Sequence, residues 1–600
     1  MNFLISLRGH DAMKHAMLSL DYFALAKEAK ALNTSGAAKV IRIALLADCA
    51  TQHLADIMRA IAARNNVQAQ VYEGNYDGVD LEILDPNSAL YAFNPQYVVI
   101  LLSGEKLKAH LYASGDRRSF ADETVGRLEN LWSAFRAQSQ ATIIQSTFVL
   151  PSERAFGNYE LKVADSVGSI FTEINYRLSV KAREAKNVLL NDVDFIAASV
   201  GRTEWFDARM WNMAKTPCRL EHLPLLAQSL LDTALAASGM FAKCVVLDLD
   251  NTLWGGVIGD DGLEGIALGE FDEGEAFVGF QTFIRELKRR GIILAVVSKN
   301  EHAAAVLPFR EHPHMVLKEE DISVFVANWD NKADNIRLVQ KTLNIGFDSL
   351  VFLDDNVFER NIVRQFLPDV VVPDLPEDPS LYLQTLAELN LFETASFSEA
   401  DLQRAEQYRE EAQRELTKTH FTNINEYLIS LGMEIRLERF NAFNLPRIAQ
   451  LMQRSNQFNL MTRRYGEAAC EAMMSDPSVA PLTVKLADKF GDYGLISVVI
   501  LKNAGSDLEI DEYLMSCRVL QRGVESFTMN NIFSYAARQG AKRVTGHYLP
   551  TKKNDMVKGF FKSFGFEKIA DGEGGASQWA LAVDAYQPRE TFMTPVVNEL

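Results

Sequence analysis

Two carboxylates lie two residues apart at the end of an apolar run. Asp248 and Asp250 follow the apolar residues 244–247, and a continuous apolar run of this length is typical of a buried parallel strand. Residues two apart in an extended chain share a face, so both carboxylates can point into one crevice. One carboxylate can then accept a phosphoryl group, while the other protonates the leaving oxygen and activates water. The pattern therefore predicts phosphoryl transfer.

Three later segments place further polar groups at predicted strand ends or at a helix start. Residues 293–298 are an apolar run that ends in the hydroxyl of Ser298. Lys332 directly precedes a helical pattern that begins near residue 333, and residues 350–353 lead into Asp354 and Asp355. Carboxylates this close together need a cation, and Mg²⁺ with oxygen ligands suits phosphate substrates.

Nucleophile, hydroxyl, lysine and acidic pair, in this order, resemble the four motifs of the haloacid dehalogenase (HAD) superfamily. The resemblance implies that Asp248 attacks the phosphate and that Asp250 acts as acid and base. It also implies a Mg²⁺ site formed by Asp248, the backbone carbonyl of Asp250, Asp354 and Asp355. Three further groups would hold phosphate oxygens: Thr252, Ser298 and Lys332.

The gaps between these motifs are too short for a large cap domain. Superfamily members that bind small free metabolites usually need such a cap to exclude water. An uncapped site stays open to a bulky substrate, such as a group held on a carrier protein. We therefore expect a HAD-like Rossmannoid domain without a large cap.

The segment before residue 235 is predicted to be a parallel α/β domain, because apolar strands alternate with helical stretches. The predicted strands cover residues 40–47, 95–102, 141–148 and 192–198. Asp48 and Cys49 lie where the first strand turns into a helix, and the layout resembles SGNH-type hydrolases with Cys49 in place of the serine. An Asp-x-x-His pattern is missing near the domain's end, so we predict that the domain is not a hydrolase. His53 is either a base for Cys49 or a surface histidine.

A strand over residues 508–516 leads to Arg522, Gly523 and a helix running to about residue 539. The backbone N–H groups of a helix N-terminus can bind a pyrophosphate. The order of elements resembles GNAT acyltransferases, which bind the pantetheine of coenzyme A at this point. An ordinary helix start explains the same residues. The resemblance assigns pantetheine or carrier binding to Arg518, Arg522 and Gly523.

Three stretches resemble the FkbH-like family, and the resemblance covers nearly the whole chain. They are residues 247–259, 453–465 and 515–525. The resemblance implies an α/β multidomain chain with four parts: an SGNH-like domain at 1–235, a HAD-like phosphatase domain at 240–376, a helical linker at 377–420 and a GNAT-like α+β domain at 421–600.

Members of this family resemble glyceryltransferase-phosphatases. Such an enzyme takes 1,3-bisphosphoglycerate, removes phosphate and loads the glyceryl group on the phosphopantetheine thiol of an acyl carrier protein, for a pathway such as polyketide biosynthesis. The alternative is a Mg²⁺-dependent phosphatase acting on a protein or sugar phosphate, with a C-terminal domain that only binds. A binding protein with a vestigial site is a third possibility, against which the intact motif residues argue.

Cys517 is the candidate nucleophile for group transfer. It lies beside Arg518 and Arg522 at a predicted helix start, and both features lower the pKa of a thiol. A glyceryl thioester on Cys517 and a buried structural cysteine are both compatible with this position, and His547 is a candidate base. A basic surface for an acidic carrier is formed by Arg454, Arg463, Arg464, Lys552, Lys553 and Lys558, although a solvated surface explains the same charges.

The composition restricts the remaining possibilities. The net charge of −18 argues against non-specific nucleic-acid binding. The five cysteines are odd in number and contain no CxxC pair, which predicts a reducing compartment. Residues 1–30 are expected to form an amphipathic helix rather than a signal peptide, and no apolar stretch is long enough to span a membrane. We therefore expect a cytoplasmic protein.

Overall fold

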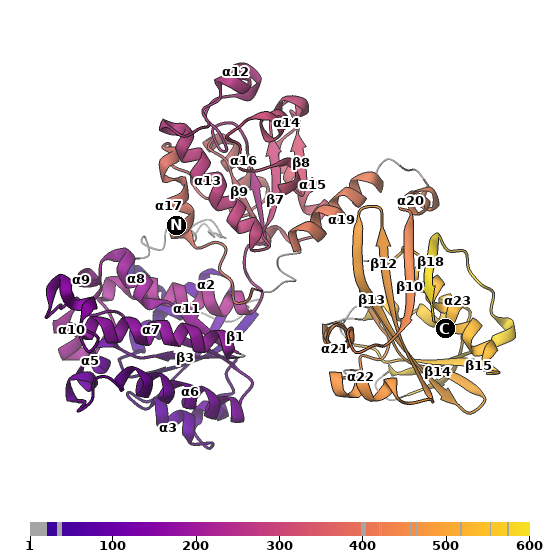
Figure 1. Cartoon of the computed structure of the whole chain (residues 1–600), viewed down its shortest axis with the longest axis horizontal. Coiled ribbons are helices and arrows are strands. Elements are labelled where there is room, and N and C mark those ends of the chain that lie inside the picture. The colour runs from indigo at the N-terminus through magenta and orange to yellow at the C-terminus, as the bar shows by residue number, and fades with distance from the viewer. Residues whose placement is uncertain are drawn as a thin grey trace, which may run out of the picture. The chain divides into compact units, whose positions relative to one another are not determined.

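The computed structural model describes residues 21–32, 39–185, 187–397, 404–418, 421, 423–454, 458–463, 465–516, 519–551, 554–572 and 575–599. The chain divides into two compact units, residues 1–405 and 406–600 (Figure 1). The first unit contains two parallel sheets and the second contains one mixed sheet. The predicted multidomain α/β fold class is confirmed. Residues 1–20 of the predicted N-terminal helix lie outside the described residues, and helix α1 covers Tyr22–Ala31.

The first sheet is parallel and has the order β2-β1-β3-β4-β5. Its strands are β1 (Lys39–Ala47), β2 (Val67–Glu73), β3 (Tyr97–Leu101), β4 (Thr142–Ser146) and β5 (Val188–Asn191). Alternate strand residues face opposite sides, so Ile43 packs in one hydrophobic cluster and Ala44 in another. The first cluster includes α2 (Gln52–Arg64) and α11 (Leu223–Ala237), and the second includes α6 (Phe120–Gln138) and α7 (Val167–Glu184).

The strand predicted over residues 192–198 is wrong. This segment forms helix α8 (Val193–Val200), and the strand β5 precedes it. The Asp192 side chain accepts a hydrogen bond from the backbone N–H of Phe195 and caps the helix. An N-terminal cap of this kind favours a helix over an extended strand even where the residues are apolar.

The second sheet is also parallel and has the order β8-β7-β6-β9. Its strands are β6 (Cys244–Leu247), β7 (Ile293–Ser298), β8 (Val324–Ala327) and β9 (Leu350–Leu353). The helices around it are α13 (Asp272–Arg289), α14 (His302–Glu311), α15 (Lys332–Leu343) and α16 (Val357–Phe366). The connection from β6 to β7 contains only α12 (Ile258–Gly265) and α13, in agreement with the absence of a large cap. A bridge between Gly255 and Ala267 closes the loop after β6, and this loop contains α12.

The segment that follows the second sheet packs against that sheet, whereas the sequence predicted a separate linker. Tyr382 and Leu386 of helix α17 (Tyr382–Leu389) lie in the same hydrophobic cluster as strands β6 and β9. Packing on this sheet therefore extends beyond the boundary predicted at residue 376. Within the predicted helical linker, α17 ends at Leu389, Asn390 follows it in a left-handed conformation, and α19 (Arg404–Lys418) begins later.

The second unit is built on a nine-stranded sheet with the order β16-β17-β15-β14-β13-β12-β10-β18, and β11 pairs with β14. The strands are β10 (Met433–Arg439), β11 (Phe458–Asn459), β12 (Val479–Asp488), β13 (Gly491–Ala504), β14 (Asp507–Met515), β15 (Arg543–Tyr548), β16 (Glu567–Asp571), β17 (Ser577–Ala582) and β18 (Met593–Asn598). Strand β15 pairs with the first half of β14, and β11 pairs with its last two residues. The two neighbours therefore contact different halves of β14.

Helices accompany this sheet. They are α20 (Ile424–Ser430), α21 (Leu445–Arg454), α22 (Glu467–Met474), α23 (Val524–Arg538) and α24 (Phe560–Ser563). The described residues of 551–565 form a 3₁₀ turn at Asp555–Val557 and α24. In the described part of the chain, the helices are too short or too polar to cross a bilayer.

Candidate active site on the second parallel sheet

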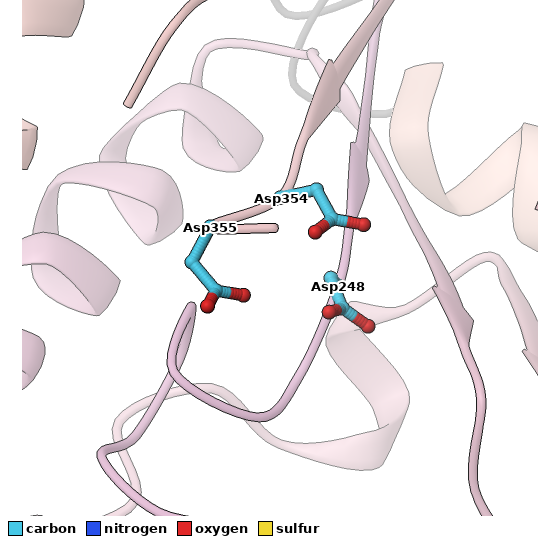
Figure 2. A group of neighbouring side chains, drawn as sticks. All are labelled: Asp248, Asp354 and Asp355. Atoms are coloured by element: carbon cyan, nitrogen blue, oxygen red, sulfur yellow. The ribbon is translucent and has the colours of Figure 1, made fainter. Parts of the chain in front are cut away.

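Three aspartates meet at the carboxyl ends of two neighbouring strands. Asp248 follows β6 and Asp354 follows β9, and these strands pair in parallel register with Leu247 opposite Leu353. The backbone N–H of Asp248 donates to the carbonyl of Leu353 over 2.9 Å. One carboxylate oxygen each of Asp248, Asp354 and Asp355 lies within 4.8 Å of the others, and Figure 2 shows the three side chains grouped at these strand ends. The parallel register therefore creates the cluster.

Lys332 neutralises part of this charge. Its Nζ lies 2.9 Å from Asp248 Oδ2 and 2.5 Å from Asp354 Oδ2, and the side chain is only 3% exposed. Lys332 is the first residue of α15, which Asn331 caps by accepting a hydrogen bond from the N–H of Ala333. Burial lowers the pKa of Lys332, but the two carboxylates outweigh burial and leave the pKa above its ordinary value. The ammonium therefore stays charged.

The single positive charge of Lys332 does not balance the negative charges of the three aspartates. Burial, followed by the charge of Asp248, raises the pKa of Asp354 to about 7, although Lys332 opposes this shift. Burial and Asp248 also raise the pKa of Asp355. Asp248 Oδ1 is buried and has no hydrogen-bond partner among the described residues. A divalent cation would relieve the repulsion between the three carboxylates and would bind Asp248 Oδ1. A ligand set made only of oxygen atoms suits Mg²⁺. The residues fit such an ion.

Asp250 occupies a separate position in the loop after β6. Its Oδ1 accepts hydrogen bonds from Trp254 Nε1 (2.9 Å) and from the N–H of Ile258 (3.0 Å). Its Oδ2 accepts one from Asn300 Nδ2 at 2.8 Å. The Asp250 carboxylate is therefore fixed by three donors, and it is not part of the three-aspartate group.

The predicted phosphate-binding hydroxyls are buried beside these groups. Thr252 Oγ1 accepts a hydrogen bond from the N–H of Asp355 at 3.2 Å. Ser298 Oγ accepts one from Asn300 Nδ2 at 3.3 Å. Asn300 thus connects Ser298 to Asp250, a role that we did not assign from the sequence. Its position two residues after Ser298 was the only available signal.

A second residue missed by the sequence analysis is Arg360 of α16. Its Nη1 donates to the backbone carbonyls of both Asp354 and Asp355 at 2.7 Å. The side chain is 3% exposed, so these bonds are shielded from water. Arg360 therefore fixes the turn that carries the acidic pair.

Replacing Lys332 by methionine should strongly impair this site. The substitution leaves Asp248 and Asp354 buried beside each other without their cation, and breaking a buried ion pair costs about 3–5 kcal/mol. Loss of a cation that stabilises transition-state charge should slow phosphate release about a hundredfold. Urea denaturation without added metal and a phosphate-release assay measure the two effects.

Lys341→Met is the matched control, because Lys341 is an exposed lysine on the same helix. Its free energy of unfolding should change by no more than about 0.5 kcal/mol. Equal phosphate release by Lys332→Met and Lys341→Met would exclude a role for Lys332 in the reaction.

The first sheet does not provide an activated nucleophile at Cys49. Burial, with a contribution from the charge of Asp48, raises the pKa of the Cys49 thiol well above its ordinary value. His53 Nδ1 lies 3.0 Å from the hydroxyl of Tyr22, so this histidine is engaged with a tyrosine. Burial raises the pKa of Asp48 to about 6, and Asp48 Oδ1 accepts a hydrogen bond from the N–H of Ser103. The Cys49 thiol is therefore uncharged near neutral pH.

Part of the predicted transfer site lies outside the described residues, namely Cys517, Arg518, Arg464, Lys552 and Lys553. Arg522 is buried and pairs with Glu411 at 2.9 Å and Asp488 at 3.7 Å. The guanidinium that we assigned to pantetheine is therefore engaged within its own unit. Gly523 caps α23 with a φ of 87°, a conformation that glycine adopts readily. His547 Nε2 lies 3.4 Å from Glu509 Oε1.

Two of the stretches that resemble the FkbH-like family meet at strand β14, where Phe458 pairs with Met515. Glu512 is fully buried, and it accepts hydrogen bonds from the backbone N–H groups of Met461 (3.4 Å) and Arg463 (2.8 Å). Burial raises the pKa of Glu512 to about 7 despite these donors. The carboxylate therefore joins the segment at 458–463 to β14, a link that the sequence analysis did not anticipate.

Residues 42–234 match the family model described as FkbH, N-terminal domain. A solved structure of the N-terminal part of protein BF1531 from Bacteroides fragilis, which contains a phosphatase domain and is complexed with Mg, is 41% identical to this chain. The match covers 63% of this chain and 100% of that one, with a TM-score of 0.60. No curated protein matches the chain.

Two acetyltransferase structures also match a quarter of the chain. They are the ribosomal-protein-S18-alanine N-acetyltransferase from Escherichia coli (12% identity, 94% of that chain, TM-score 0.20) and the spermidine N-acetyltransferase from Vibrio cholerae in complex with CoA and spermine (14%, 97%, 0.21). Each match covers 25% of this chain. These scores are too low to assign a fold.

Proposed function

The chain belongs to the same protein family as BF1531 and is an enzyme of the phosphatase type, and from this premise we propose that it makes a glyceryl carrier protein. In this proposal it removes phosphate from 1,3-bisphosphoglycerate with Mg²⁺ and loads the glyceryl group on the phosphopantetheine thiol of an acyl carrier protein. The observation that carries the phosphatase half is the buried cluster of Asp248, Asp354, Asp355 and Lys332. The transfer half rests on the resemblance of the sequence stretches to the FkbH-like family.

The two phosphates of the substrate have different fates in this proposal. The acyl phosphate carries the activation that a thioester needs, so a thiol attacks its carbonyl carbon and phosphate leaves. Hydrolysis of the acyl phosphate would leave a free carboxylate, which is not activated for thioester formation. The HAD-like site therefore takes the phosphate ester at the other end of the molecule.

In the phosphatase half, the Asp248 carboxylate attacks phosphorus and the bond from phosphorus to the ester oxygen breaks. Asp250 gives its proton to the leaving oxygen, then takes a proton from a water that hydrolyses the aspartyl-phosphate. Lys332 balances the charge on the phosphoryl oxygens. Asp248, Asp354 and Asp355 would hold Mg²⁺, which when bound supplies positive charge that draws the anionic phosphate towards the carboxylates.

Mass spectrometry of the carrier tests the whole proposal. The protein is incubated with 1,3-bisphosphoglycerate, Mg²⁺ and a carrier protein bearing phosphopantetheine. We expect the carrier to gain one glyceryl group, and chelation of Mg²⁺ should leave it with a phosphoglyceryl group instead. Phosphate release without any acylated carrier, using carriers from the same genome, would favour the alternative of a phosphatase whose C-terminal domain only binds.

A further inference from the structure

An ion pair beside the phosphatase site connects the ends of two strands that are not neighbours in the second sheet. Lys299 follows β7, and its Nζ lies 2.6 Å from Oε1 of Glu359 in the first turn of α16. Helix α16 follows β9, and in the order β8-β7-β6-β9 the strand β6 separates β7 from β9. The ion pair therefore ties the loop after β7 to the helix after β9, across the strand that leads into Asp248.

The acidic partner of this ion pair is buried and firmly anchored. The Glu359 side chain is 9% exposed, and its Oε2 is buried without a hydrogen-bond partner among the described residues. Loss of the Lys299 cation would leave this carboxylate uncompensated, which is strongly unfavourable, so the lysine is held at this position. The next residue, Arg360, donates to the carbonyls of Asp354 and Asp355, so the turn that anchors Lys299 is itself fixed to the acidic pair.

The loop that Lys299 anchors also holds the carboxylate of Asp250. Two of the three described donors to Asp250, Trp254 and Ile258, belong to the same connection after β6 as Asp250 itself. The third is Asn300, which directly follows Lys299 and donates to Asp250 Oδ2 at 2.8 Å. Release of Lys299 would therefore loosen Asn300, and Asp250 would lose the donor that fixes it relative to the neighbouring strand.

We propose that Lys299 and Glu359 are positioning residues, which act through Asn300 to align Asp250 for proton transfer. This inference rests on the proposed function, in which Asp248 attacks phosphorus and Asp250 protonates the leaving oxygen. As the bond from phosphorus to the ester oxygen breaks, its electron pair goes to that oxygen and the Asp250 proton must reach it. A misplacement of about 1 Å can slow such a step about a hundredfold. A poorly aligned Asp250 should therefore slow the release of leaving groups that need the proton.

Two phosphate esters separate this positioning role from a general loss of structure. Glycerol 3-phosphate has an alkoxide leaving group that needs the proton, whereas p-nitrophenyl phosphate expels a phenolate that is stable without one. We compare kcat/KM with Mg²⁺, because it reports the steps up to departure of the alcohol or phenol. For Lys299→Met it should fall at least about tenfold with glycerol 3-phosphate and stay within about threefold with p-nitrophenyl phosphate. Lys299→Arg keeps the charge and should restore most of the lost rate.

Lys288→Met is the matched control for breaking an ion pair. Lys288 Nζ lies 2.6 Å from Asp321 Oδ1, the same separation as between Lys299 and Glu359. Lys288 lies in the last turn of α13, before β7, and Asp321 lies in a 3₁₀ turn before β8. This pair is therefore at the amino ends of the strands, away from the site. Lys288→Met should process both esters within about twofold of wild type, as expected for a distant and independent position.

The outcomes distinguish failure of this inference from failure of the proposed function. Equal slowing of both esters by Lys299→Met, or the same kcat/KM values as Lys288→Met, would overturn the positioning role. Glu359→Gln removes the other charge of the pair and should show the same selectivity between the esters, so it decides if Lys299→Met fails to fold. If the wild-type chain releases no phosphate from either ester with Mg²⁺, the phosphatase assignment itself is overturned, and the positioning role with it.

Discussion

Asp248→Asn is expected to slow release of the ester phosphate by more than about a thousandfold, or about 4 kcal/mol in barrier height. The amide keeps the shape of the side chain but cannot attack phosphorus. In the proposed reaction a thiol, and not Asp248, consumes the acyl phosphate, so the thiol chemistry should continue. The carrier should therefore accumulate a phosphoglyceryl group, which differs from the glyceryl product by one phosphoryl group in mass.

Asp260→Asn controls for loss of a nearby negative charge. Asp260 is exposed on α12, in the loop that follows Asp250. This variant should release phosphate within about twofold of wild type, as expected for a barrier change below 0.5 kcal/mol. Glyceryl carrier formed at the wild-type rate by Asp248→Asn would show that another group attacks the phosphate.

Cys517→Ala is expected to abolish loading of the carrier while ester phosphate release at Asp248 survives. A thiolate at Cys517 would attack the carbonyl carbon of the acyl phosphate and expel phosphate, giving a thioester on the enzyme. The carrier thiol then attacks this thioester and releases the Cys517 thiolate. The second step exchanges one thioester for another, so the activation of the acyl group is retained.

Peptide mass spectrometry separates this relay from direct transfer. With substrate and no carrier, the wild-type peptide containing Cys517 should gain the acyl group, whereas the peptide containing Cys470 should not. Cys470 is the matched control, because it is a buried cysteine of the same unit. An unmodified Cys517 peptide, together with normal loading by Cys517→Ala, would establish direct attack by the pantetheine thiol on the substrate.

The second sheet shows which parts of the site can be predicted from local sequence patterns. Short apolar runs predicted the ends of β6, β7 and β9, and parallel pairing then brings Asp248 beside Asp354. Lys332, at the helix start after Asn331, lies 2.9 Å from Asp248 and 2.5 Å from Asp354. Each of these steps needs only residues that are adjacent in sequence, together with the general geometry of parallel strands.

Contacts between distant segments were not predictable in the same way. Arg522 pairs with Glu411, a residue more than a hundred positions earlier, and no local pattern connects the two. The apolar residues after Asp192 fit a strand or a helix equally well, and the Asp192 cap decided between them. Asn300 and Arg360 likewise act through bonds that only the folded chain makes.

Acid-quenched turnover with Mg²⁺ tests most directly whether Asp248 forms a covalent bond to the phosphoryl group. Reduction of the quenched protein with borohydride, followed by peptide mass spectrometry, converts an aspartyl-phosphate into homoserine at its site. We predict this conversion at Asp248 in the wild-type chain and its loss in Asp248→Asn. Conversion at Asp250 or Asp354 instead, or none at any aspartate while phosphate is being released, would contradict the account.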